Sequence, residues 1–306
     1  MKNYQRKNLN GLIAGLNPAQ SSGAVYSVTA VLPVLFSFVF LIFILATGLA
    51  TGDYAESDWF LYSSFLLPQT AFFVIAFVFL RADRTGLETV TSKPHWKYFI
   101  VAVVLQIGLL SLSELNTWFI KFLGGIGYVE NEIKIPSMDG MGFFGVLFVI
   151  AVLPAVFEEL IFRGLLLKGL KNCGETFAVL ICGALFALYH QKPEQTVYQF
   201  CCGAAFALVA IRSGSILPTV LSHFLNNAWI LIMTKFSWSL ASIYLPFLIC
   251  SAICLVGSLA YLLFFDKKEG FRQFEKKKSI KDFLFFAGIG IFICLFSWIS
   301  ALFIGL

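Results

Sequence analysis

Long apolar segments separated by short polar loops form the main pattern of this chain. Nine such segments can be read, each of roughly 15 to 25 residues, the length that a tilted helix needs to cross a hydrocarbon core of about 30 Å. Their apolar residues are continuous and do not alternate with polar ones, so the pattern predicts helices. A helix also satisfies the backbone hydrogen-bonding groups of a spanning segment, which lipid cannot do. The predicted segments lie near 25–50, 58–80, 97–120, 141–171, 176–190, 195–211, 215–234, 243–265 and 282–306.

The segments at 176–190 and 195–211 are short and lack clear flanks, so eight or nine spans are expected. Composition agrees with a membrane protein, because 59% of the 306 residues are hydrophobic and 13% are charged, whereas soluble domains carry about 25% charged residues. The predicted fold is therefore an all-α polytopic transmembrane helix bundle. The first residues include Lys2, Arg6 and Lys7 but no short apolar segment with a cleavage site, so no removable signal peptide is expected.

The positions of lysine and arginine predict how the chain lies in the membrane. With the N-terminus inside, 18 of the 22 basic residues fall in inner segments, as the positive-inside rule requires. The acidic loop 51–58 suits the outer face, and with nine spans the C-terminus lies outside. The basic run 276–278 is interpreted as part of an inner loop that meets anionic lipid, and no nucleic-acid partner is expected. The four outer basic residues are Lys121, Lys134, Lys192 and Lys235.

Few ionisable side chains lie at membrane depth in this prediction. Three of the 17 acidic residues fall within predicted spans, namely Glu114, Glu158 and Glu159, together with the histidines His190 and His223. A charged group in a span costs about 2.5 to 3.5 kcal/mol on insertion scales, so a cluster of them needs partners or a function. Glu114 lies near the outer end of its span, where it can reach the interface. The other four are candidates for a site.

Helical spacing brings these side chains together. Glu159 and Arg163 are four residues apart and can pair, whereas Glu158 points about 100° away. Glu158 lies 16 residues before Gly174 and His190 lies 16 after it. In an antiparallel hairpin that turns at Gly174, the carboxylate and the imidazole therefore arrive at the same height. With the N-terminus inside, this height is about 8 to 15 Å from the inner interface, so access from the cytoplasm is expected, and a lateral or outer opening stays open as an alternative.

The following helix adds His223 and Asn227, which share a face at positions i and i+4. A carboxylate with an imidazole can hold and deprotonate a water, so Glu158 and His190 form the candidate catalytic pair. His223 and Asn227 can donate hydrogen bonds to the oxyanion that forms when water attacks a carbonyl group, and the set predicts amide hydrolysis. A second interpretation makes Glu158, His190 and His223 the ligands of a zinc ion whose bound water attacks. The residues alone leave both mechanisms open.

Three motifs follow one another on successive predicted spans: Glu158-Glu159-x-x-x-Arg163, Phe186-x-x-x-His190 and His223-x-x-x-Asn227. In this order they resemble the motifs of the CPBP (Abi) intramembrane proteases, a family that includes the type II CAAX prenyl endopeptidases. The resemblance covers about 141–235. It divides the chain into N-terminal transmembrane helices at 1–140, a catalytic core at 141–235 and C-terminal transmembrane helices at 236–306.

The resemblance implies a helical membrane endopeptidase in which Glu158 and His190 activate water while His223 and Asn227 hold the oxyanion. A metal requirement is argued both ways for such proteins, and the version without a cofactor is favoured here, with zinc as the alternative. The implied partners are the lipid bilayer and a membrane peptide or lipidated protein, such as a prenylated CAAX tail. The implied location is the plasma membrane of a bacterium. The supporting residues are Glu159, Arg163 and Phe186, the last by packing next to the site.

Functions of two other classes fit the same residues. A non-catalytic scaffold that acts in envelope signalling or bacteriocin immunity could retain the polar cluster as packing between helices. A transporter could use the carboxylates and histidines as a proton relay. Replacement of Glu158 by Gln and of His190 by Ala separates these functions, because a phenotype that survives both changes excludes hydrolysis.

Overall fold

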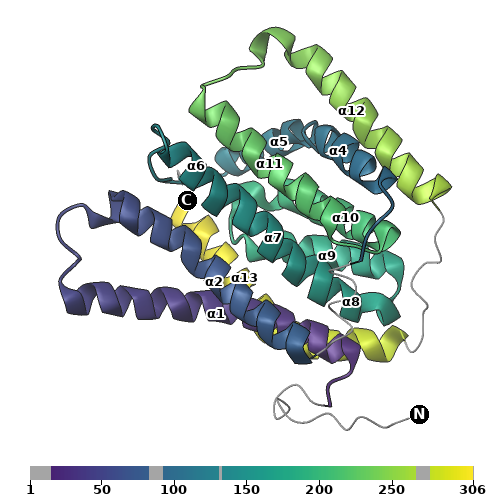
Figure 1. Ribbon diagram of the computed structural model, residues 1–306, viewed down its shortest axis with the longest axis horizontal. Coiled ribbons are helices and arrows are strands. Elements are labelled where there is room, and N and C mark those ends of the chain that lie inside the picture. Colours follow the sequence, from purple (N-terminus) through teal and green to yellow (C-terminus); the bar gives the residue numbers. More distant parts are fainter. Residues whose placement is uncertain (1–14, 83–91, 131–132, 267–275, 306) are drawn as a thin grey trace.

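The computed structural model describes residues 15–82, 92–130, 133–266 and 276–305, and helices form nearly all of them (Figure 1). No β-strand occurs in these ranges, so the predicted all-α bundle is confirmed. Each of the nine predicted apolar segments falls on helix. The α-helices are α1 (Pro18–Thr47), α2 (Asp58–Ala82), α4 (Lys97–Leu109), α5 (Leu112–Gly125), α6 (Gly142–Val146), α7 (Leu153–Glu159), α8 (Leu167–Gly169), α9 (Glu175–Tyr189), α10 (Thr196–Ser213), α11 (Leu217–Lys235), α12 (Tyr244–Ala260) and α13 (Lys276–Gly305).

Short 3-10 and π-helical segments complete the bundle. Two π-helical segments, η2 (Leu147–Val152) and η3 (Leu160–Leu166), lie on either side of α7 in one continuous helical rod. A third π-helical segment, η7 (Tyr261–Phe265), ends the rod that α12 begins. The 3-10 segments are η1 (Tyr54–Glu56), η4 (Leu170–Cys173), η5 (Pro193–Gln195) and η6 (Ala241–Ile243).

Seven helical segments of the described chain are long and apolar enough to cross a membrane, which is fewer than the eight or nine spans expected. The two that fall short are α9 and α11. Helix α9 has 15 residues and is about 22 Å long at 1.5 Å per residue, below a core of about 30 Å. Helix α11 carries the polar residues of the third motif. The seven segments are Pro18–Thr47, Asp58–Ala82, Lys97–Gly125, Gly142–Gly169, Pro193–Ser213, Ala241–Phe265 and Lys277–Gly305.

Two boundaries differ from the predictions for local reasons. Helix α1 begins before residue 25 because Asn17 and Gln20 form a capping box, in which each side chain accepts the backbone N–H of the other at 3.0 Å. Helix α13 begins at Lys276, so the basic run 276–278 lies in its first turn and not in a loop. Long lysine side chains can extend from such a turn to the membrane surface.

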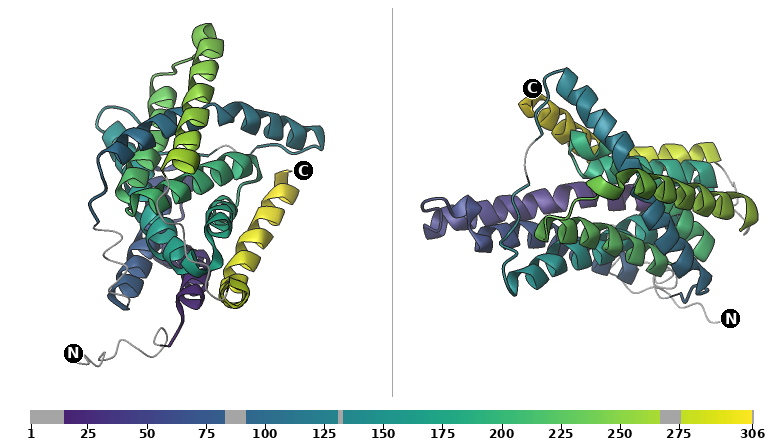
Figure 2. Two further views of the ribbon diagram at one scale, coloured as in Figure 1. Left: turned by 90° about the vertical axis from the view of Figure 1, so that its right-hand side faces the viewer. Right: turned by 90° about the horizontal axis from the view of Figure 1, so that it is seen from above.

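The helices form three layers, with α1, α2 and α13 along one side and α12 along the other (Figures 1 and 2). Helix α1 packs lengthwise against α13, although the two are far apart in sequence. Helices α4 and α11 contact each other, and α12 packs on α4. The rod that contains α7, together with α9 and α10, occupies the middle layer. The centre of the bundle is therefore built by the segment 142–235.

Ion pairs lie at both ends of the bundle, where alternating helices begin and finish. We call the end at which α4 begins the first end, and the last turn of α10 and the end of η7 lie there too. The opposite end, which holds the last turn of α11, is the second end. The basic residues that the positive-inside rule assigns to one side of the membrane thus lie at the same end of the bundle. Which end faces the cytoplasm remains a prediction. The pairs at the first end are Lys97–Asp266 (3.2 Å) and Arg212–Glu175 (2.6 Å), and those at the second are Lys134–Glu56 and Lys235–Asp139 (3.3 Å).

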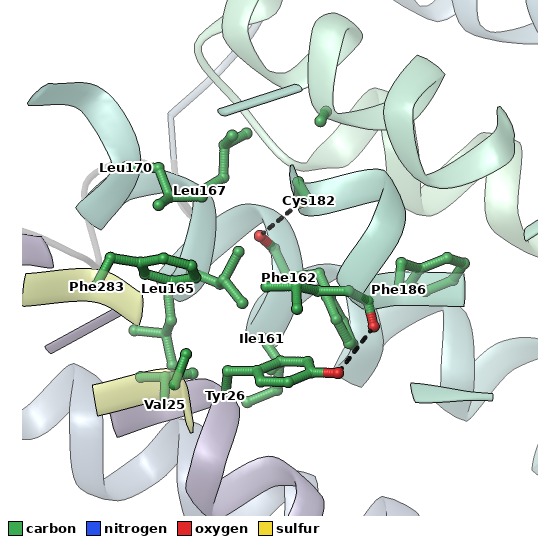
Figure 3. Packing of buried hydrophobic residues seen from close by; sticks show 14 of the residues in the cluster. Val25, Tyr26, Ile161, Phe162, Leu165, Leu167, Leu170, Cys182, Phe186 and Phe283 are labelled. Carbon is green, nitrogen blue, oxygen red and sulfur yellow. Dashed lines mark hydrogen bonds between the residues drawn. The ribbon is translucent and has the colours of Figure 1, made fainter. Parts of the chain in front are cut away.

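The buried core fixes the rod of α7 between α1 and α9 (Figure 3). The Tyr26 hydroxyl donates to the Leu185 carbonyl oxygen at 3.3 Å, which ties α1 to α9. The rings of Phe162 and Phe186 meet edge to face with centroids 5.1 Å apart. Offset and edge-to-face ring pairs are favoured beyond their buried area, so this contact orients η3 relative to α9.

Candidate active site

A cavity of about 1260 Å³ opens within the middle layer, and all four predicted catalytic side chains line it. Glu158 comes from α7, His190 follows the last residue of α9, and His223 and Asn227 come from α11. Its walls also include parts of α2, α5 and α10, with Gln69 in the α2 wall. The sequence-based expectation that three helices bring these residues to one place therefore matches the geometry. We call this space the site cavity.

Glu159, Arg163 and His223 form a fully enclosed ionic cluster behind Glu158. Arg163 Nη1 donates to Glu159 Oε1 at 2.7 Å, so the predicted i, i+4 pair forms, and neither side chain is exposed. His223 Nδ1 lies 3.0 Å from the same carboxylate oxygen. Because an ionised carboxylate can only accept, this nitrogen of His223 carries a hydrogen. Arg163 Nη2 donates to the Gly203 carbonyl oxygen at 3.1 Å, which ties the cluster to α10.

Aromatic rings enclose the Arg163 guanidinium. Its Cζ lies 4.6 Å from the ring centroid of Phe186 and 5.4 Å from that of Phe206. A cation over an aromatic face is attracted by the ring, most strongly where water is excluded. Phe186 also contacts both histidine rings, with centroids 4.7 Å from His190 and 6.0 Å from His223. Phe186 of the second motif therefore packs against the guanidinium of Arg163 and both histidine rings.

The close contact of α9 and α10 depends on glycine. A Cβ atom on Gly203 would lie 2.9 Å from Gly183 Cα, and one on Gly183 would lie 2.8 Å from the Phe200 carbonyl oxygen. Small residues allow helix backbones in membranes to approach in this way. The approach brings the Gly203 carbonyl within reach of Arg163.

Two π-helical turns place the acidic pair. Segments η2 and η3 flank α7, so Glu158 and Glu159 lie at the junction of α-helical and π-helical geometry. Single π turns within α-helices occur frequently at functional sites. These turns were not predicted from the sequence, since hydropathy does not distinguish an i to i+5 pattern from an i to i+4 pattern over one turn.

Glu158 faces the site cavity and is 8% exposed. Its Oε2 lies 3.9 Å from His223 Nε2 and has no hydrogen-bond partner among the described residues. Gln69 of α2 faces the same carboxylate, and its own Oε1 is also buried without such a partner. Two buried acceptors without donors mark a place where a water molecule or a substrate N–H fits. Gln69 was missed from the sequence because only ionisable residues were sought, and its signal is an amide inside an apolar segment.

His190 presents one free ring nitrogen. Its Nδ1 lies 2.8 Å from the Phe186 carbonyl oxygen, and since a carbonyl can only accept, Nδ1 carries the hydrogen. In the neutral ring Nε2 is then an acceptor. The next residue, Gln191, has φ of 55°, in the left-handed region, so the chain leaves the helix directly after His190. This turn holds the imidazole at the wall of the site cavity.

Asn227 is fixed on both sides of its amide. Its Nδ2 donates to the Ile150 carbonyl oxygen of η2 at 2.9 Å, and its Oδ1 accepts from Asn226 Nδ2 at 3.1 Å. One N–H of Asn227 remains to be donated to a ligand in the site cavity. This is the donor that the oxyanion role requires.

The cavity lining extends toward the second end of the bundle. It includes Lys192, Trp238 and Tyr244, and the residues of the first end are not among those that line it. With the N-terminus inside, this direction leads outward, whereas the sequence had favoured access from the cytoplasm. The rise per residue along a helix could not show where side chains leave space. Burial lowers the pKa of Lys192, against the opposing effect of Glu194.

Glu114 takes no part in this site. Its carboxylate accepts from Trp118 Nε1 at 2.9 Å and from the Tyr244 hydroxyl at the exposed surface. Glu114 lies in the first turn of α5, inside the apolar segment Lys97–Gly125, so its expected position near the end of a span stays a prediction.

A zinc ion would need three converging ligands. Among the described residues, no group of three His, Cys, Asp or Glu side chains is placed to hold a metal ion. Glu158, His190 and His223 therefore do not form a ligand set in this structure. Metal dependence itself remains a prediction for chelation experiments.

Comparison with known proteins finds a family model that matches the segment carrying this site. Residues 140–229 match the family model described as type II CAAX prenyl endopeptidase Rce1-like. The chain is thus a multi-pass membrane protein with a segment similar to that family, and the resemblance inferred from the three motifs is confirmed.

A curated protein matches this chain over a segment of similar length. The UPF0177 protein YajF of Lactococcus lactis subsp. lactis (strain IL1403) is 32% identical over 97 residues, which are 31% of this chain and 47% of that protein. The match thus spans about half the length of the relative. No solved structure matches the chain.

Proposed function

We propose that this protein is an intramembrane endopeptidase that hydrolyses a peptide bond of a membrane-associated or prenylated, CAAX-like peptide or protein. The observation that supports this most strongly is that Glu158, His190, His223 and Asn227 line one cavity. The Rce1-like match over 140–229 covers all four residues. The division at 1–140, 141–235 and 236–306 and the setting in a bacterial plasma membrane are parts of the same proposal.

In this proposal Glu158 and Nε2 of His190 hold the water. One of them takes a proton as the water oxygen adds to the carbonyl carbon, and the carbonyl oxygen becomes an oxyanion. The free N–H of Asn227 and Nε2–H of a protonated His223 donate to that oxyanion. The C–N bond then breaks, and the proton held by the base passes to the leaving amine.

Charge balance supports a protonated His223 in this role. Its Nδ1–H is held by Glu159, and its Nε2 faces Glu158 across 3.9 Å. With Arg163 and His223 as cations and the two glutamates as anions, the enclosed cluster has a formal charge of zero. Buried charges that are paired in this way avoid most of the cost of an isolated ion.

The size of the cavity favours a peptide over a proton relay. At about 1260 Å³ it exceeds the 300 to 1000 Å³ or so that is typical of small-ligand sites. A relay of protons needs no such volume. A non-catalytic scaffold would bind the same peptide without cleaving it, and this alternative is decided by the following experiment.

The test compares cells that express the wild type, Glu158→Gln or Glu114→Gln. Proteomics of peptide ends in the membrane fraction should find ends that depend on the wild type and persist with Glu114→Gln but are lost with Glu158→Gln. Glu114 is the matched control because it lies on α5 outside the site cavity. Identical sets of peptide ends in all three, at equal protein levels, would refute hydrolysis, and flux that depends on a pH gradient without any peptide would favour transport.

Purified protein allows the same comparison with a defined probe. A quenched fluorogenic peptide that ends in a farnesylated CAAX sequence should be cleaved by the wild type and not by Glu158→Gln. Treatment with a chelator should leave the rate unchanged if no metal is required, and restoration of a lost rate by zinc would establish the zinc-dependent alternative.

The side of access can be measured separately. Ser239→Cys places a thiol on the lining of the site cavity. With the N-terminus inside, a membrane-impermeant maleimide should label this cysteine in intact cells above the labelling of the parent protein. Labelling only after the cells are opened would reverse the proposed orientation.

A further inference from the structure

A chain of neutral side chains ends at Asn227. Asn226, which is 6% exposed, accepts from Gln106 Nε2 at 2.9 Å and from the Tyr198 hydroxyl at 2.7 Å, both at its Oδ1. Asn226 Nδ2 donates to Asn227 Oδ1 at 3.1 Å, and Asn227 Nδ2 donates to the Ile150 carbonyl oxygen at 2.9 Å. We call Gln106, Tyr198, Asn226 and Asn227 the amide network.

The direction of every bond in this network follows from one backbone group. The Ile150 carbonyl oxygen can only accept, so the nitrogen of the Asn227 amide must face it. The oxygen of Asn227 then faces Asn226, which must donate its own nitrogen in return. The oxygen of Asn226 is left to accept from Gln106 and Tyr198. A flip of either asparagine would place two donors or two acceptors against each other in a buried site, which is costly.

The network is assembled from separate elements. Gln106 lies in α4, Tyr198 in α10, the two asparagines in α11 and Ile150 in the π-helical segment η2. Helix α4 lies outside the segment 140–229 that matches the family model. The flanking helices therefore contribute to the site and do more than shield it from lipid.

We propose that Asn226, held by Gln106 and Tyr198, is a positioning residue that locks the Asn227 amide with one N–H aimed at the reacting carbonyl oxygen. Asn226 and Tyr198 also line the site cavity, and in this role Asn226 acts through Asn227. The inference rests on the proposed hydrolase function, because it assigns Asn227 to the oxyanion.

The variant Asn226→Asp tests this directly. It keeps the shape and the acceptor for Gln106 and Tyr198, but it replaces the donor to Asn227 by a second acceptor, so the Asn227 amide turns. With the farnesylated fluorogenic peptide, kcat should fall by about 10- to 100-fold with little change in KM, since misplacement of a group by about 1 Å costs about 100-fold. Asn226→Ser, which is too short to reach Asn227, should behave alike, and Tyr198→Phe should lower kcat by about 5-fold through loss of one hydrogen bond.

The decisive measurement is made in an Asn227→Ala background. If Asn226 acts only through Asn227, then Asn226→Asp should cause no further fall in kcat there, whereas independent effects would multiply. Thr234→Val, an exposed change on the same helix, is the matched control and should leave kcat unchanged. Unfolding temperatures measured for every variant separate a loss of folding from a loss of positioning.

The possible results are distinct. A kcat for Asn226→Asp or Asn226→Ser within twofold of the wild type overturns the inference, as does a full further loss in the Asn227→Ala background. If either variant fails to fold, the other and Tyr198→Phe are judged by the same criteria. If the wild type does not cleave the peptide, or if Glu158→Gln cleaves it equally well, the hydrolase proposal fails first and the network has no reaction to serve.

Discussion

Removal of the Arg163 charge should destabilise the protein strongly. Arg163→Met would leave the Glu159 carboxylate, which is 0% exposed, with His223 as its remaining partner, and would also remove the bond to the Gly203 carbonyl. Breaking a buried ion pair from one side costs about 3 to 5 kcal/mol. At about 2 to 4 °C per kcal/mol, the unfolding temperature should fall by about 6 to 20 °C.

The assay is thermal unfolding of purified protein in one detergent, with each variant compared with the wild type. The double variant Arg163→Met with Glu159→Gln should recover much of the lost stability, because no unpaired charge is then buried and the amide oxygen can still accept from His223. Lys134→Met is the control. Its pair with Glu56 is 58% and 62% exposed, and surface pairs contribute about 0 to 1 kcal/mol.

A small effect of Arg163→Met, comparable with that of Lys134→Met, would refute this reasoning, because it would mean that Glu159 is neutral or hydrated in the folded protein. A double variant that is less stable than the single variant would also refute it. Neither measurement depends on catalysis, so the ionic cluster can be tested without a substrate.

Three further predictions concern the walls of the site. Gly203→Ala should lower the unfolding temperature, because the new Cβ would lie 2.9 Å from Gly183 Cα, whereas alanine at an open helix position would be tolerated. Gln69→Leu should lower kcat for the fluorogenic peptide by about 10-fold with normal folding, since an acceptor beside the attacking water is lost, and an unchanged kcat would remove Gln69 from the site. Lys192 should react with an amine-acylating reagent at pH 8 faster than the exposed Lys277, because a lowered pKa gives more neutral amine at that pH; mass spectrometry of the labelled protein measures both rates.

The helices could be predicted from hydropathy because the lipid core dictates both their length and their composition. Glu158, His190 and His223 could be proposed as candidates because ionisable groups at membrane depth are rare, and Asn227 because it shares a helical face with His223 at i+4. Each of these inferences considered a single helix or a single hairpin. Such spacing arguments apply only where the chain forms regular helices.

Features that depend on several elements at once were not predictable in this way. Gln69 and Asn226 are neutral amides, so a search for charges overlooks them, and their relevance appears only when α2, α4 and α10 are packed around α7 and α11. The break between α4 and α5 at residues 110–111 interrupts a segment that hydropathy treats as continuous. The direction in which the site cavity opens depends on the volumes of side chains from several helices, and the periodicity of one segment carries no information about them.

The pairing of α1 with α13 has a consequence for biogenesis. Asn17 and Asp282, which bond at 2.6 Å, are 265 positions apart, so a ribosome that adds about 5 to 20 residues per second makes the second about 13 to 53 s after the first. During that interval the face of α1 that later receives α13 can meet only lipid or an insertion chaperone. Ribosome-bound chains that stop before α13 should therefore crosslink from α1 to the insertion machinery, and the crosslinks should disappear once the last helix has emerged.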